Sequence, residues 1–201
     1  MPLSMPVPRK ARQHRQIRTE GFLREDGLWD IEGHLVDLKE YPTENPYLGR
    51  VPPGEPIHSM HVRLTIDVEK RIHEVEVAMD AHPFPPCPGA VPNFQRLKGE
   101  VIGRGFTERL HALVGKTAGC THTVWLIQCC AITAIHTIAG QLGWGLKGEP
   151  VSVFGAGQKG KRSPLIGSCH AYDPGSIVVR DTFPEHYTGS DLVGGPGAVN
   201  S

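Results

Sequence analysis

The stretch that decides the fold is residues 58–67, HSMHVRLTID, followed by residues 71–80, RIHEVEVAMD. Apolar and polar residues alternate strictly in both segments, which is the pattern of strands with one buried face. The buried face of the first strand carries His58, Met60, Val62, Leu64 and Ile66. Because only three residues separate the two segments, the pattern predicts an antiparallel hairpin with one face on a core.

Upstream, residues 14–41 show a second pair of strands joined by a turn at residues 25–27, EDG. In the second of these strands, LWDIEGHLVDL, the two predicted faces have different compositions. Odd positions supply Trp29, Ile31, Gly33 and Leu35, whereas even positions supply Asp30, Glu32 and His34.

Helices are predicted downstream. A short helix is expected at about 92–97. A second one is expected over ERLHALV, 108–114, with Thr107 as its N-cap. A long helix is expected over the apolar run from 121 to about 140–143. SIVVRDTF, residues 176–183, is predicted as a strand. Strands followed by helices indicate an α+β fold, an antiparallel sheet covered on one face by helices. We expect one domain over 13–187, an N-terminal arm at 1–12 and a flexible tail at 188–201.

The composition argues against some classes of protein. The 201 residues include 21 basic and 21 acidic side chains, which argues against a nucleic-acid partner held by a basic surface. The long apolar run contains Gln128, Thr133 and His136, so a core helix is favoured over a membrane span. Five cysteines without a secretory signal indicate a reducing, cytoplasmic location.

A glycine-rich segment, residues 155–162, GAGQKGKR, imitates a phosphate-binding loop. The motif fails at its last position, and Pro164 disfavours the helix that should follow. We therefore predict a mobile basic loop there and no nucleotide site.

The segment GCTH, residues 119–122, opens the long helix. On a continuous helix Cys120 and His122 would point about 200° apart, but at a helix entrance both can lie near the free amides, which favour a thiolate. His58, on a core-facing strand position, and Cys87, in the loop after the hairpin, could reach the same end. These four residues form a mixed set suited to zinc or iron. A packing thiol with a capping histidine remains the alternative.

The polar face of the upstream strand supplies other candidates. Asp30 or Glu32 could act as a general base or support a metal-bound histidine, although a merely solvated face is also consistent with the pattern. Trp29 and Tyr41 could border an aromatic-lined pocket. Arg63 is a further candidate for substrate binding, on the strand face opposite His58.

The segments DGLWDIEGHLVDLK and GEPIHSMHVRLTID, then Cys87, GCTH and SCHA, resemble a bacterial family catalogued as a domain of unknown function, over about residues 8–187. Some relatives are associated with catabolism of aromatic compounds, and they include a phenylcoumaran γ-formaldehyde lyase of lignin-dimer degradation. The resemblance implies a carbon–carbon lyase that releases formaldehyde from a small aromatic substrate bearing a hydroxymethyl group. Its cofactor would be a divalent metal ion (zinc, iron or manganese), and its catalytic residues Asp30, Glu32 and His122. A homo-oligomer is left open.

A more distant resemblance concerns the fold of U-type iron–sulfur scaffold proteins. Cys87 and Cys120 fall on two scaffold cysteines and His58 on the third, but Met60 and Gly119 replace an aspartate and a histidine of that site. This resemblance implies an iron–sulfur or metal carrier as a rival function. A non-catalytic binding protein with structural zinc is the other.

Overall fold

The computed structural model describes residues 3–143, 163 and 165–189. The chain forms two compact units, 1–138 and 139–201, which are described separately. The predicted extent of a single domain, 13–187, stays a prediction. Residues 3–12 form neither helix nor strand. The predicted basic loop at 155–162 and residues 190–201 of the predicted tail lie outside the described residues.

The first unit contains two sheets, with strands β1 Gln13–Leu23, β2 Trp29–Lys39, β3 Thr43–Asn45, β4 Gly49–Val51, β5 Pro56–Ile66 and β6 Ile72–Ala81. The main sheet has the order β1-β2-β5-β6, and all neighbours are antiparallel. β3 and β4 form a small separate hairpin. Both predicted strand pairs are therefore confirmed.

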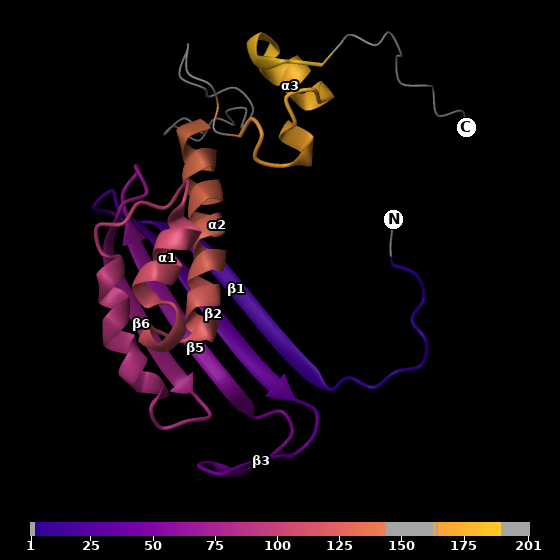
Figure 1. Cartoon of the computed structure of the whole chain (residues 1–201), viewed down its shortest axis with the longest axis vertical. Coiled ribbons are helices and arrows are strands. Elements are labelled where there is room, and N and C mark those ends of the chain that lie inside the picture. The colour runs from indigo at the N-terminus through magenta and orange to yellow at the C-terminus, as the bar shows by residue number, and fades with distance from the viewer. Residues whose placement is uncertain (1–2, 144–162, 164, 190–201) are drawn as a thin grey trace. The chain divides into compact units, whose positions relative to one another are not determined.

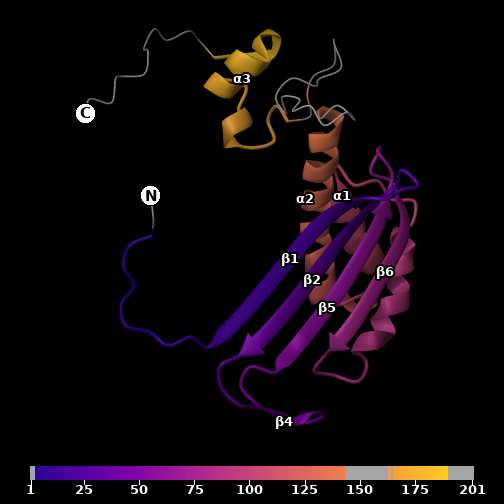
Figure 2. The same ribbon diagram turned by 180° about the vertical axis from the view of Figure 1, so that it is seen from behind.

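Helices follow the strands: the 3₁₀ helix η1 Cys87–Leu97, α1 Phe106–Val114, the 3₁₀ turn η2 Lys116–Ala118 and α2 Thr121–Gly143. Figure 1 shows η1, α1 and α2 in front of the sheet. Figure 2, from behind, shows the strands of the opposite face without a helix over them. The predicted α+β fold, an antiparallel sheet with helices on one face, is confirmed. The resemblance to the iron–sulfur scaffold fold stays a prediction.

The core lies between the sheet and the helices, where the alternation predicts it. Seven apolar residues of β2 and β5 are buried on the helix side: Trp29, Ile31, Leu35, Met60, Val62, Leu64 and Ile66. They pack with Phe94 of η1, Leu110 of α1, and Leu126, Ile127 and Cys130 of α2. Burial of such side chains contributes about 1.5–3 kcal/mol each, so this layer supplies much of the stability of the unit.

Two glycines let α2 lie close to β1 and β2. A Cβ at Gly33 would come within 2.6 Å of the Cys130 sulfur, and one at Gly21 within 2.4 Å of the Thr137 hydroxyl. The hydroxyls of Thr19 and Thr133 are 2.7 Å apart across the same contact. The helix is thereby held over these two strands, which places its N-terminus beside the end of the sheet. Within the described residues, no helix is both long and apolar enough to cross a membrane.

Two local predictions are wrong. The N-cap of α1 is Gly105 in a left-handed conformation, φ 74°, because the helix begins at Phe106. The predicted strand at 176–183 is the short helix α3, Ile177–Thr182, flanked by the 3₁₀ turns η3 His170–Tyr172 and η4 Pro184–His186. The hydroxyl of Ser176 caps α3 by accepting the N–H of Val179, which overrides the β-branched composition.

Candidate metal centre

A carboxylate and two imidazoles meet where β2, β5 and the first turn of α2 come together. Asp37 and His58 stand directly opposite each other in the β2–β5 ladder. The Nδ1 of His58 is 3.1 Å from the Oδ2 of Asp37, and the Nε2 of His122 is 3.7 Å from the same oxygen. One donor atom from each residue lies within 4.8 Å of the other two, so these three side chains could hold a metal ion.

A β-bulge follows the site directly. The β2–β5 register shifts between Asp37 and Leu38, because Leu38 pairs with Pro56 and leaves Ile57 unmatched. Bulges are common next to functional sites, where they end regular pairing and redirect side chains. Here the regular register of the ladder ends at the Asp37–His58 pair.

Arg15 of β1 fixes the carboxylate. Its Nε and NH2 groups donate to the two oxygens of Asp37, each at 2.7 Å. The side chain of Asp37 is only 6% exposed. Burial alone would raise the pKa of this carboxyl, but the hydrogen bonds and charge of Arg15, with His58 and His122, hold it below its usual value. Asp37 is therefore a buried, ionised acceptor that is already oriented.

The two imidazoles stack on each other, with ring centroids 3.8 Å apart and planes at 29°. Burial and the neighbouring His122 lower the pKa of His58, against the opposing effect of Asp37. A neutral His58 keeps a nitrogen lone pair, which is the form that binds metal. When its Nδ1 carries the proton, that N–H can donate to Asp37, an arrangement that orients metal-ligating histidines.

Cys120 lies immediately before α2 and contacts His122, with 3.8 Å between its sulfur and Nδ1. Burial would raise the pKa of the thiol, but hydrogen bonding from His122 and from the N–H and hydroxyl of Thr123 lowers it to about 7. The Thr123 hydroxyl is fully buried and makes no hydrogen bond of ordinary geometry in the described residues. A thiolate at Cys120 would give that hydroxyl an acceptor.

The donors open into a pocket of about 490 Å³ between the end of the sheet, η1 and the start of α2. All four residues of the predicted metal set line it: His58, Cys87, Cys120 and His122. Much of the remaining wall is apolar, with Met60, Pro83, Phe84, Pro86 and Ala90. The predicted meeting of a strand histidine, a loop cysteine and the helix entrance is thus visible in the structure.

The structure does not bring all four residues to ligand distance. In the described part of the chain, the group with metal-ligand spacing consists of Asp37, His58 and His122. Cys120 reaches His122 but is not part of that group, and Cys87 lines the pocket without joining it.

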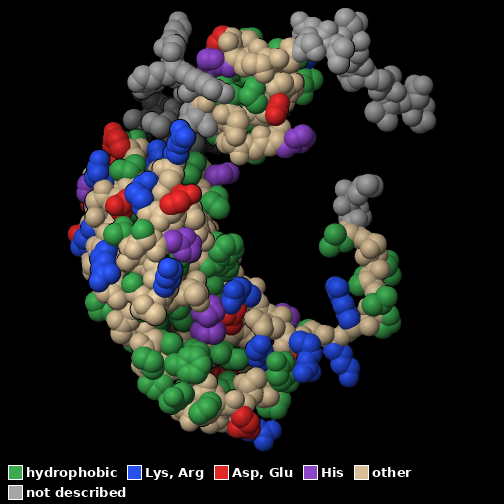
Figure 3. Space-filling model, viewed as in Figure 1, with side chains coloured by type: hydrophobic (Ala, Val, Ile, Leu, Met, Phe, Trp, Pro, Cys, Tyr) green, Lys and Arg blue, Asp and Glu red, His purple; other side chains and the backbone are tan. Residues whose placement is uncertain are grey.

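An aromatic pair stands at the pocket wall. Phe84, which lines the pocket, meets Tyr47 of the β3–β4 hairpin edge-on, with centroids 6.0 Å apart. The amide of Asn45 donates to the carbonyl of Pro83 and ties the hairpin to this loop. Figure 3 shows hydrophobic side chains gathered at the lower end of the helix-bearing face, toward the end of the sheet where β3 lies in Figure 1. The sequence did not predict this contact between Phe84 and Tyr47.

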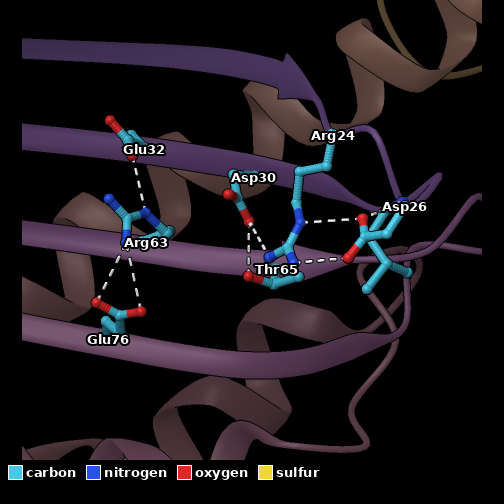
Figure 4. A network of polar contacts seen from close by, with 8 residues as sticks. Arg24, Asp26, Asp30, Glu32, Arg63, Thr65 and Glu76 are labelled. Atoms are coloured by element: carbon cyan, nitrogen blue, oxygen red, sulfur yellow. Dashed lines mark hydrogen bonds and ion pairs between the residues drawn. The ribbon is translucent and has the colours of Figure 1, made fainter.

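Three predicted residues lie across the sheet from the pocket, on the open face. Figure 4 shows Asp30, Glu32 and Arg63 in a polar network there. Asp30 accepts the hydroxyl of Thr65 at 2.6 Å, and Glu32 accepts the Nε of Arg63 at 2.8 Å. Because the sheet separates them from His58, neither carboxylate can act as a base in the pocket. The alternation of apolar and polar residues in β2 already predicted that Asp30 and Glu32 lie on the face opposite the core.

The predicted aromatic residues are also elsewhere. Trp29 is buried in the core at the start of β2, eight positions from Asp37, which is about 27 Å along an extended strand. Tyr41 lies just after β2 with the guanidinium of Arg12 over its ring, 4.0 Å from the centroid. Neither residue lines the pocket.

Asp37 was missed by the sequence reasoning, although a signal was present. It continues the odd-numbered series Trp29, Ile31, Gly33 and Leu35, which is the core-facing series of β2. An acidic residue at the end of an apolar face needs a partner or a ligand, because burying a lone carboxylate is costly.

Two imidazoles and one carboxylate are a donor set that catalytic zinc and iron sites use, and three protein ligands leave positions open for substrate. The donors fit that role: Asp37 is ionised, His58 has a lowered pKa, and the two histidines line one pocket. The arrangement can hold a divalent ion with room for a small molecule beside it.

Comparisons with known proteins give one positive result. A family model described as "Protein of unknown function (DUF2889)" matches residues 13–136, which span the whole main sheet, η1, α1 and most of α2. No curated protein sequence and no solved structure matches the chain significantly. The matched range covers more than half of the 201 residues and contains every donor of the candidate centre, so the chain belongs to the DUF2889 family.

Proposed function

We propose that the protein is a metal-dependent lyase that releases formaldehyde from a small aromatic substrate bearing a hydroxymethyl group. One observation carries the proposal: Asp37, His58 and His122 have metal-ligand spacing, and both histidines line a largely apolar pocket. The reaction type comes from the resemblance to the family with the phenylcoumaran γ-formaldehyde lyase. Zinc, iron and manganese are the candidate ions, because all three accept imidazole or carboxylate ligands.

The pocket supports an aromatic ligand. Its volume of about 490 Å³ falls within the range of about 300–1,000 Å³ that is typical of small-molecule sites. Phe84 offers a ring for an edge-on or offset contact, and Tyr47 packs edge-on against it. Asn93 and Thr117 also line the pocket and could orient a hydroxyl or methoxyl substituent.

Loss of formaldehyde requires that a base take the proton of the hydroxymethyl group. The carbon–carbon bond then breaks as the carbonyl of formaldehyde forms. The electron pair of that bond stays on the substrate carbon, where the aromatic portion stabilises it, and the proton that the base removed returns to this carbon. A bound divalent ion would supply positive charge that lowers the pKa of the hydroxyl. His122 and Cys120, which line the pocket, would accept or relay the proton, whereas Asp30 and Glu32 lie across the sheet.

The first experiment measures metal content and formaldehyde release together. The purified protein, loaded with zinc, ferrous iron or manganese in turn, is given a phenylcoumaran bearing a hydroxymethyl group. His58→Ala and His122→Ala should each lower metal affinity at least tenfold and abolish release. His34→Ala is the matched control, because His34 lies on the open face and bonds to Ser59. Full activity in metal-free protein would sink the proposal.

The same preparation separates the rivals. An iron–sulfur carrier would be brown and would hand its cluster to an acceptor without releasing formaldehyde. With structural zinc, Cys120→Ser would unfold the protein rather than only silence it. Under the lyase proposal, circular dichroism of Cys120→Ser should remain that of the folded protein.

A further inference from the structure

The two edge strands of the main sheet, β1 and β6, differ in how other segments of the chain bond to them. At β6, the N–H of Ile72 donates to Glu100 and its carbonyl accepts from Gly99, both at 2.8 Å. The amide of Gln95 donates to the carbonyl of Val75 at 2.6 Å. η1 and the segment after it therefore bond to this edge at Ile72 and Val75.

β1 forms the opposite edge, visible as the outermost strand in Figures 1 and 2. All 11 of its residues pair with β2 in an unbroken register. Among residues 3–143, 163 and 165–189, no hydrogen bond reaches its outer edge. The strand is long, has no bulge in its pairing and contains neither proline nor lysine in QHRQIRTEGFL. Most of the devices that protect exposed edges from pairing are absent.

We propose that β1 pairs antiparallel with β1 of a second copy across a two-fold axis, so that the two sheets become one continuous eight-stranded sheet. Identical edges related by a two-fold axis make a closed, isologous interface. This inference is independent of the proposed lyase activity and of any bound metal.

The charges of β1 select the register. When the axis passes through Thr19, Arg18 of each copy stands opposite Glu20 of the other, and both lie on the open face. Ile17 stands opposite Gly21 on the helix-bearing side. An axis through Arg18 would place two arginines opposite each other, and like charges at that position are destabilising. Charge complementarity therefore favours a second copy in the Thr19-centred register.

The same register covers part of the candidate metal centre. Arg15, whose side chain is 40% exposed, would stand opposite Leu23 of the second copy on the helix-bearing side. Leu23 is 52% exposed in the single chain. Placing it beside Arg15 would shield the Arg15–Asp37 pair from water and strengthen it. Pairing at the edge would thus reach the carboxylate of the centre through one side chain.

Charge swaps at the edge test the register. Sedimentation equilibrium of the full chain should show a dimer, and Arg18→Glu or Glu20→Arg alone should weaken it about tenfold by facing like charges. The double variant R18E/E20R should restore it. Mixing the R18E chain with the E20R chain should give a heterodimer tighter than either homodimer, because both cross-strand pairs are then opposite in charge. Glu74→Lys, on β6, is the matched control and should leave the dimer unchanged.

Hydrogen exchange supplies an independent readout. In the dimer, amides along the whole of β1 should be protected, and dilution should expose the outward-facing half. The proposal is overturned by a monomer at every concentration, or by a dimer that is indifferent to both single swaps. Protection of β1 in a monomer would also overturn it, because another part of the same chain would then cover the edge.

Discussion

Both faces of the main sheet carry acidic and basic side chains, but these side chains lie in different surroundings. On the helix-bearing face, Asp37 is buried with Arg15 and two imidazoles beside an apolar pocket. On the open face, carboxylates such as Glu32 stand beside arginines such as Arg63 in partly exposed ion pairs. The difference teaches that an acidic residue indicates a site only when its strand position faces an apolar environment.

The exposed ion pairs and the buried carboxylate also differ in what they contribute to stability. Exposed ion pairs contribute about 0–1 kcal/mol each, because water and salt screen both charges. A buried carboxylate is costly unless its charge is fully compensated, as it is at Asp37 by two hydrogen bonds from Arg15. The open face can therefore tolerate loss of a charge that the helix-bearing face cannot.

The largest expected difference compares two adjacent residues of β2. Leu35 is fully buried under the helices, whereas Val36 lies on the open face and is half-buried. Leu35→Ala should lower the free energy of unfolding by about 3 kcal/mol because it leaves a cavity in the core. Val36→Ala should lower it by less than about 1 kcal/mol. Urea denaturation followed by circular dichroism measures both. Equal losses would mean that the open face is covered in solution.

The next comparison replaces one aspartate on each face. Asp37→Asn should cost about 2 kcal/mol of unfolding free energy, because it removes charged hydrogen bonds from a buried group. Asp30→Asn, which keeps a partner in Thr65, should cost less than about 1 kcal/mol. Only Asp37→Asn should also weaken metal binding, which isothermal titration can measure. If Asp30→Asn weakens metal binding equally, the assignment of the centre to the helix-bearing face fails.

The pH dependence of Asp37→Asn has a defined sign. Because the folded-state pKa of Asp37 is lowered, its charge contributes stability that is fully present above the unfolded pKa of about 4. That contribution is lost as the pH falls through the folded-state pKa. The difference in unfolding free energy between wild type and Asp37→Asn should shrink below about pH 4. A difference that stays constant through this range would show that the charge does not contribute.

The smallest effect is expected at the Glu32–Arg63 pair of the open face. Both side chains are about 40% exposed, so Glu32→Gln should change the free energy of unfolding by less than about 0.5 kcal/mol. Raising the salt concentration should erase even that difference. Thermal unfolding with and without added salt measures it. The proposed release of formaldehyde should be unchanged, since Glu32 lies across the sheet from the pocket.

Alternation in the sequence predicted the strands, their faces and the α+β class, because a period of two requires only local information. The same alternation, extended by one step from Leu35, points to Asp37. Asp30 and Glu32 were predicted to be catalytic because of their carboxyl groups. Their even positions, however, place them on the face opposite the core. The entrance of α2 was predicted from the apolar run and GCTH, and α2 begins at Thr121 as expected.

Other parts of the site could not be predicted from one sequence. Arg15 meets Asp37 across 22 positions, and Phe84 meets Tyr47 across a stretch of chain that includes β4, β5 and β6. Such contacts depend on strand order and on how loops return, and alternation does not determine either. Cys87 was expected to reach the pocket and does line it, but its distance from the histidines was beyond sequence reasoning.

The bulge after Asp37 has a consequence for how the site can vary among related chains. Regular pairing of β2 and β5 ends there, so residues 40–55 can change in length or composition without shifting the core-facing register behind them. This excursion includes the β3–β4 hairpin that supports Phe84. The donor residues Asp37 and His58 and this part of the pocket wall thus lie on separate segments, so the wall can change while the positions of the donors are kept.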